Sequence, residues 1–136
     1  MIQSLAALTI LVPRYEEGLD FFCGALGFAV SEDARLGPDR RWVVVAPHSG
    51  VGAKIVLAVP SDDRQRARIG DQSGGRVGYF LLTDDFQKDY EAMRARGVRF
   101  LETPRREPYG EVAVFADPWG GKWDLLQPTD TSGDTM

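Results

Sequence analysis

Few side chains in this sequence could carry chemistry, and their surroundings separate them. His48, the only histidine, lies in a Pro-His-Ser-Gly turn, where a lone imidazole is usually solvated. Cys23, the only cysteine, falls on the apolar face of a predicted helix, which favours core packing over nucleophilic chemistry. Asp124 interrupts the apolar run WDLL, and burying a carboxylate without a partner is costly. Asp124 is therefore the candidate catalytic or ligand-binding residue.

Three interpretations of Asp124 stay open. It is a structural carboxylate if a nearby cation satisfies it, and Lys54 or a loop arginine is then the expected partner. It is otherwise a fixed anion that orients a ligand, or a general base whose pKa burial would raise. General acid–base catalysis usually needs a second positioned group, and the strand positions expected around Asp124 contain no histidine.

Composition excludes several classes of protein. The chain has 136 residues, 43% of them hydrophobic and 26% charged, which is typical of a globular domain. A net charge of −4 argues against a surface for nucleic acid or anionic membrane, because both need clustered cations. A single cysteine permits no internal disulfide, and no apolar run reaches membrane-spanning length. We predict a cytoplasmic protein with neither a nucleic-acid nor a membrane partner.

The elements that must position these residues occur twice along the chain. Each copy reads as strand, helix, short strand, polar loop and hairpin, from apolar periodicity and from Gly and Pro positions. The first copy is predicted at 5–12, 15–26, 28–31, 32–41 and 42–60. The second copy is predicted at 77–83, 86–96, 98–101, 102–110 and 111–128.

The segments around the two copies complete the expected organisation. A polar linker at 61–76 contains one or two helical turns capped by Ser61, and Asp84 or Asp85 caps the second helix. Gly27 and Gly97 end the two helices. A polar tail follows at 129–136. We predict one domain, 1–136, with module 1 at about 5–60 and module 2 at about 77–128.

Three short motifs accompany the duplicated order. They are Phe21-Phe22 with Leu26-Gly27-Phe28, then the turn DPWGG at 117–121, and then WDLL at 123–126. In these motifs the chain resembles the vicinal oxygen chelate superfamily of glyoxalase I, bleomycin-resistance proteins and extradiol dioxygenases, over about residues 5–128. The resemblance implies an α+β fold of paired βαβββ modules, with a curved mixed sheet that encloses a groove. It also implies a homodimer. It says little about activity, because one fold hosts many chemistries.

Metal-dependent members of that superfamily take four ligands from equivalent places in the two copies. Counted by the repeat, these places fall on Ala7, Val56, Gly78 and Asp124. Three of them offer no ligating side chain, and one carboxylate without an imidazole would hold a divalent ion weakly. We therefore expect no metal and no cofactor.

The expected ligand pocket follows from strand parity, because residues two apart on a strand share a face. Aromatic residues near the predicted rim are added to these strand positions. The predicted pocket residues are Ala7, Thr9, Leu11, Trp42, Lys54, Val56, Gly78, Phe80, Tyr109, Trp119, Asp124 and Leu126. Small and apolar side chains at former ligand positions favour a flat or apolar small-molecule ligand.

Two classes of function remain on this reading. The first is a metal-free binding protein that sequesters a planar or aromatic compound, as bleomycin-resistance-like members do. The second is an enzyme, either a lyase or dioxygenase-like member with a divergent site or a metal-independent acid–base catalyst that uses Asp124. The first is favoured, because the predicted pocket lacks a second acid–base group.

Overall fold

The structure is a computed structural model that describes residues 1–129, so the predicted tail at 129–136 lies outside it except for Thr129. The chain forms two compact units, one of residues 1–69 and one that begins at Gly70. In the part of the chain that the structure describes, no helix is long and apolar enough to span a membrane.

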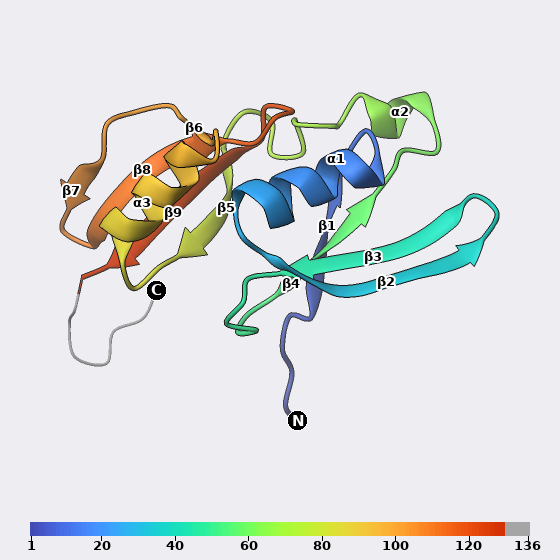
Figure 1. Cartoon of the computed structure of the whole chain (residues 1–136), viewed down its shortest axis with the longest axis horizontal. Coiled ribbons are helices and arrows are strands. Elements are labelled where there is room, and N and C mark those ends of the chain that lie inside the picture. The colour runs from blue at the N-terminus through green and yellow to red at the C-terminus, as the bar shows by residue number, and fades with distance from the viewer. Residues whose placement is uncertain (130–136) are drawn as a thin grey trace. The chain divides into compact units, whose positions relative to one another are not determined.

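The first unit packs a helical segment against a four-stranded sheet (Figure 1). The strand order is β1-β4-β3-β2, in which β1 and β4 are parallel and the other neighbours are antiparallel. Ile55 and Leu57 are buried, and Gly18 packs against Leu57, so this face of β4 lies under the helix. The elements are β1 (Ala7–Leu11), α1 (Tyr15–Leu19), η1 (Asp20–Ala25), β2 (Ala29–Gly37), β3 (Arg40–Ala46), β4 (Lys54–Ala58) and α2 (Asp63–Arg66).

The first helix begins at Tyr15 as predicted but changes pitch after α1. Segment η1 is a π-helix, and the N–H of Leu26 donates to the carbonyl of Phe21, five residues earlier, at 2.9 Å. The wider turn shifts the apolar face, so Phe21 and Phe22 are buried while Cys23 is only half-buried. Gly27, with φ of 78°, follows the helical segment at the predicted end.

The prediction of a polar loop at 32–41 is wrong. Strand β2 continues to Gly37 and forms a long hairpin with β3. Register shifts interrupt the pairing between Val30 and Glu32 and again near Gly37. The strand is at the edge of its sheet and exposed, so its polar composition masked it. Arg41 on β3 ties the hairpin together, through hydrogen bonds of 2.9 and 2.8 Å to Asp33.

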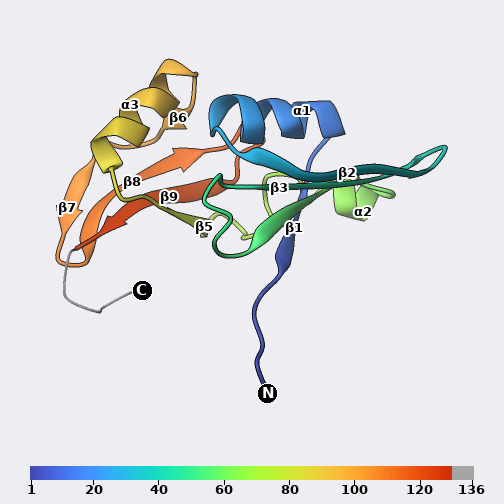
Figure 2. The same cartoon turned by 60° about the horizontal axis from the view of Figure 1, so that its bottom comes forward.

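The second unit repeats this plan with a sheet of five strands, covered on one face by a single helix (Figure 2). The strand order is β5-β9-β8-β6, with β7 also paired to β8. As in the first unit, the first and last strands are parallel neighbours. The elements are β5 (Val77–Leu82), α3 (Phe86–Ala95), β6 (Arg99–Phe100), β7 (Arg105–Glu107), β8 (Gly110–Ala116) and β9 (Lys122–Pro128).

Local chemistry at the helix ends was predicted well, with one exception. The Asp85 side chain caps α3 by accepting from the N–H of Lys88, and Gly97 follows with φ of 91°. In α2 the cap is Asp62, not Ser61, because the Asp62 carboxylate accepts from the N–H of Gln65 at 2.8 Å. The short strand β7 also lies inside the segment predicted as a loop at 102–110.

The predicted linker is packed against the second unit from Gly70 onward. A side chain at Gly70 would overlap the carbonyl of Trp119, and one at Gly78 would overlap the Ser73 hydroxyl. The segment around Ser73 therefore lies directly on β5. Together the two units confirm an α+β fold of paired modules with mixed sheets. The single-domain organisation stays a prediction.

Candidate functional site

The two faces of the second sheet differ in what covers them. Towards α3, the side chains of Phe115, Trp123 and Leu125 are buried together with Phe86 and Met93 of the helix. The opposite face is called here the Asp124 face. By strand register and parity its central part consists of Phe80, Leu82, Val112, Val114, Asp124 and Leu126, and Lys122 lies on the same face at the start of β9.

The Asp124 face is apolar but unevenly buried. Phe80 and Leu82, on the edge strand β5, expose 58% and 56% of their surface. Val112 and Leu126, nearer the centre of the sheet, are buried. The face therefore offers accessible apolar surface at the β5 edge, next to a closed apolar floor.

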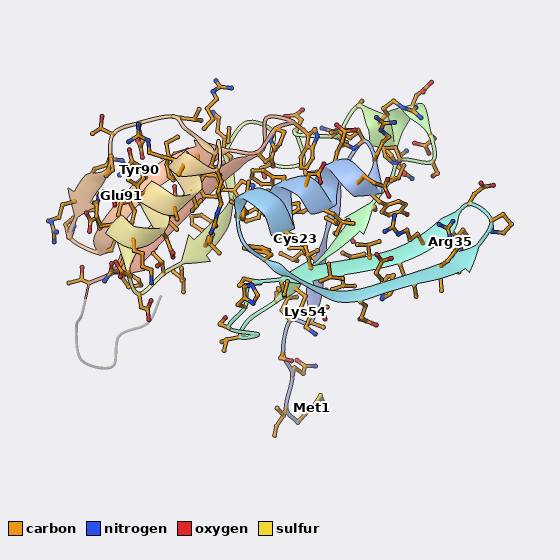
Figure 3. All side chains as sticks on the ribbon, viewed as in Figure 1. Met1, Cys23, Arg35, Lys54, Tyr90 and Glu91 are labelled. Carbon is orange, nitrogen blue, oxygen red and sulfur yellow. The ribbon has the colours of Figure 1, made fainter. Side chains whose placement is uncertain are left out.

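Asp124 lies where the exposed and buried parts of this face meet. It pairs with Phe80 of β5 on one side and with Val114 of β8 on the other. Its Oδ1 atom is buried and has no hydrogen-bond partner among the described residues. Lys54, one of the partners predicted for a structural carboxylate, belongs to the first unit, where its ammonium donates to the Ser31 hydroxyl at 2.9 Å. Figure 3 labels Lys54 on β4 of the first unit.

The arginine whose charge acts on Asp124 is Arg105 of β7, and it is already bound by other carboxylates. Its Nε lies 3.1 Å from both Glu102 oxygens, and its Nη1 donates to Glu107 at 2.8 Å. Glu102 also accepts from the N–H of Val114 at 2.9 Å, which fixes this group beside the strand pair. The guanidinium of Arg105 is thus already neutralised by the carboxylates of Glu102 and Glu107, without a contribution from Asp124.

The electrostatics of Asp124 follow from this arrangement. Burial is the main effect and raises the pKa of the Asp124 carboxyl; Arg105 opposes the rise and Glu102 adds to it. A carboxyl whose pKa is higher in the folded chain binds protons more tightly there than in the unfolded chain. Its ionisation therefore lowers stability as pH rises through the raised pKa, and the penalty disappears at low pH. Asp124 would therefore be stabilised by a hydrogen-bond donor that residues 1–129 do not supply.

The corresponding face of the first unit contains no carboxylate at the equivalent position. Val56 of β4 lies between Thr9 of β1 and Val44 of β3, and Ala7 lies beside Lys54. Thr9 is exposed, whereas Val44 is buried. This face is thus mainly apolar, with a lysine at one end.

The residues at the four superfamily ligand positions do not fit a metal ion. Ala7, Val56 and Gly78 have no ligating side-chain atom, and Ser73 packs directly on Gly78. Among residues 1–129 no three His, Cys, Asp or Glu side chains gather as a metal cluster would require. Gly78 consequently does not enlarge a cavity as expected, because the chain's own serine covers it.

The structure groups the predicted pocket residues by unit and leaves several apart. Phe80, Asp124 and Leu126 share one face, as do Thr9 and Val56 in the first unit, and Leu11 pairs with Ala58 on β4. Tyr109, in the turn before β8, interacts with Arg105 and so adjoins the Asp124 face. Sequence reasoning missed Glu102 and Arg105, although their opposite charges three residues apart were a usable signal. Membership of one common pocket stays a prediction.

The remaining predicted residues have other surroundings. Trp42 of β3 is 40% exposed, and Trp119 lies in the turn at 117–121. His48 is exposed in its turn. Cys23, which Figure 3 labels on the helical segment, is half-buried, and burial raises the pKa of its thiol, which disfavours the reactive thiolate.

Asp117 is the one buried charged residue in the described part of the chain, and its contacts are structural. Its carboxylate accepts from the N–H groups of Trp119 at 3.1 Å and Gly121 at 2.8 Å, and from the Trp123 indole at 3.2 Å. Burial raises the pKa of Asp117 while these donors lower it. The turn motif therefore holds the β8–β9 connection and does not form a reactive site.

Several known proteins are similar to this chain in sequence or in structure. The sequence matches the model of the Glyoxalase/Bleomycin resistance protein/Dioxygenase superfamily over residues 4–125. It is 44% identical to an uncharacterized protein of Shewanella frigidimarina (strain NCIMB 400) over 131 residues, covering 96% of this chain and 97% of that protein. The crystal structure of UcmS2 is similar with a TM-score of 0.80 at 27% identity, covering 93% of this chain and 98% of that one. TnmS3, an antibiotic binding protein from Streptomyces sp. CB03234, gives 0.75 at 29% identity, covering 94% and 98%.

Proposed function

The chain belongs to the Glyoxalase/Bleomycin resistance protein/Dioxygenase superfamily, and within it we propose that this protein binds a small, planar and largely apolar organic compound without a metal. The observation that carries the proposal is the Asp124 face. There, exposed Phe80 and Leu82 border a carboxylate whose buried oxygen lacks a partner among the described residues. Similarity to an antibiotic binding protein supports the same class of ligand.

Apolar burial is the expected source of affinity. A flat ring placed against Phe80 gains both area burial and a stacking geometry, which together contribute about 1–3 kcal/mol. Val112 and Leu126 are buried and present almost no surface, so the apolar contacts of the ligand come from the exposed Phe80 and Leu82. Such a site selects by shape and apolarity, and Asp124 adds one oriented polar contact.

The enzymatic alternatives have less support. A general base at Asp124 needs a second acid–base group, and the charged neighbours that act on its pKa, Arg105 and Glu102, are bound to each other. A metal-dependent lyase or dioxygenase needs ligands that Ala7, Val56 and Gly78 do not supply.

Titration with flat aromatic compounds tests the proposed function. The three tryptophans provide a fluorescence signal, and binding is expected to persist in buffer containing EDTA. Phe80→Ser should weaken binding about tenfold, because an exposed aromatic contact is removed while no core residue changes. Val51→Ser is the matched control, since Val51 is 79% exposed in the β3–β4 connection. If the Phe80 variant and the wild type bind with equal affinity, β5 is not part of the binding site. If no compound binds, the proposed function is contradicted.

We also propose a two-fold homodimer. Within their own units β1, β2 and β5 are edge strands, and unpaired strand edges favour association. Val30 and Leu36 on β2 are also exposed, 49% and 56% respectively. Sedimentation over a range of protein concentrations should reveal a species of twice the chain mass. A monomer that persists in concentrated solution would contradict the proposal, because mass action favours a dimer there.

A further inference from the structure

We propose that the compound bound at the Asp124 face is an organic cation, and that its binding is coupled to ionisation of Asp124. This inference rests on the proposed function and specifies its ligand class. It depends on three properties of the face: an acceptor atom without a partner among the described residues, an excess of negative charge, and apolar side chains on both sides of Asp124.

The acceptor is the buried Oδ1 atom of Asp124. Its strand neighbours across the sheet, Phe80 and Val114, contribute apolar side chains that cannot donate a hydrogen bond. A buried acceptor without a donor is unfavourable. A ligand that donates an N–H group removes this desolvation penalty and also adds a hydrogen bond. An ammonium or amidinium group suits the position best, because a charge-assisted hydrogen bond to a carboxylate is about twice as strong as a neutral one.

The charges around the face distinguish a cation from an anion. Arg105 contributes one positive charge, and it is bound by Glu102 and Glu107. Together with ionised Asp124, the four side chains carry a net charge of −2. Lys122 lies two residues from Asp124 on the same face of β9 and is half-exposed, and its positive charge reduces the net charge of the group to −1. No further charged side chain is presented by β5 or β8 at the positions paired with Asp124. An anionic ligand would meet repulsion here, whereas a cation would be attracted.

Protonation adds a dependence on pH that a purely apolar site would not show. A protonated Asp124 is neutral and can accept only an ordinary hydrogen bond from a cation, so the ionised form binds the cation more tightly. Burial raises the pKa of Asp124, so the competing protonated form persists to higher pH than in an exposed aspartate. Affinity for a cation should therefore increase as pH rises through this pKa, and affinity for a neutral ring should change little.

Three flat, three-ring probes of similar shape separate these alternatives: proflavine as the cation, acridone as the neutral ring and anthracenecarboxylate as the anion. Their affinities for the full chain can be measured by probe fluorescence and by calorimetry. Proflavine should bind about 10- to 100-fold more tightly than acridone at neutral pH, with anthracenecarboxylate weakest. As pH rises from the usual aspartate range of about 4 through the raised pKa of Asp124, proflavine binding should strengthen, and acridone binding should stay level.

Asp124→Asn is the decisive variant. It should bring proflavine to the affinity of acridone and abolish the pH dependence, while acridone binding changes less than about threefold. Glu91→Gln removes the same charge from α3, which covers the other face of the sheet, and should leave the selectivity intact. Without ligand, Asp124→Asn should melt no lower than the wild type at neutral pH, because it removes the charge of a half-buried carboxylate whose Oδ1 atom has no partner among the described residues.

The outcomes distinguish this inference from the proposed function. If acridone and anthracenecarboxylate bind as tightly as proflavine, the site is apolar but does not select cations, and the inference is wrong while the proposed function stands. If none of the three binds, both are contradicted. If Asp124→Asn keeps the cation preference, or melts markedly lower than the wild type, Asp124 is a structural residue and the inference fails.

Discussion

Asp117→Ala is expected to destabilise the second unit by about 3–5 kcal/mol, because one carboxylate satisfies three donors there. Trp123 is buried, so its indole N–H would lose its acceptor without access to water, at a cost of about 1–3 kcal/mol. The N–H groups of Trp119 and Gly121 lie in a more exposed turn and would recover part of their loss. Denaturant titration followed by tryptophan fluorescence measures the change.

Two matched variants test the cause of that loss. Asp117→Asn keeps one carbonyl acceptor but turns an amide donor towards the donors around it, so an intermediate loss is expected. Asp84→Ala removes an exposed aspartate from the connection between β5 and α3 and should change stability by less than about 0.5 kcal/mol. If Asp117→Ala unfolds at the same denaturant concentration as the wild type, these hydrogen bonds do not stabilise the turn.

Gly70→Ala is expected to lower the free energy of unfolding by about 3 kcal/mol, through two effects that act together. Gly70 has a φ of 73°, which is unfavourable for any side chain. Its added Cβ would also overlap the backbone carbonyl of Trp119, which cannot rotate away as a side chain would. Accommodating the methyl group therefore requires the segment to separate from the β8–β9 turn.

Gly74 provides the control for the backbone effect alone. Its φ is 64°, nearly the same, but no atom lies within 4 Å of an added Cβ. Gly74→Ala should thus cost about 1 kcal/mol, and the difference between the two variants measures the packing of the segment on the turn. Equal losses for both variants would indicate that Gly70 does not press against Trp119.

The two stability predictions bear on function because the Asp117 turn leads directly into β9, which positions Asp124. A slip of one residue in β9 would move Asp124 to the α3 side of the sheet and Trp123 to the other. The hydrogen bond from the Trp123 indole to Asp117 opposes such a slip. We therefore expect variants of the turn to weaken ligand binding as well as stability.

Much of the fold was determined by patterns within short stretches of sequence. Alternation along β4 and β9, the Asp85 cap and the glycines at 27 and 97 are local features, and the structure agrees with each. The repeat that aligns Val56 with Asp124 also holds, because the two residues occupy equivalent places between strands. Period and turn chemistry depend on neighbours in the chain, so a single sequence is enough to read them.

Only the tertiary structure decided what lies beside these residues. The polar strand β2 looked like a loop, because an exposed edge strand needs no apolar alternation. Ser73 covers Gly78, a position that strand parity alone had assigned to a pocket. The sequence suggested Lys54 or an unspecified loop arginine as a partner of Asp124. In the structure Lys54 donates to Ser31, and Arg105, whose charge acts on Asp124, is held by Glu102 and Glu107. The physical reason is that the path of the backbone decides which side chains meet. Lys54 and Ser31 are 23 residues apart, and even Ser73 and Gly78 meet only because the backbone turns between them.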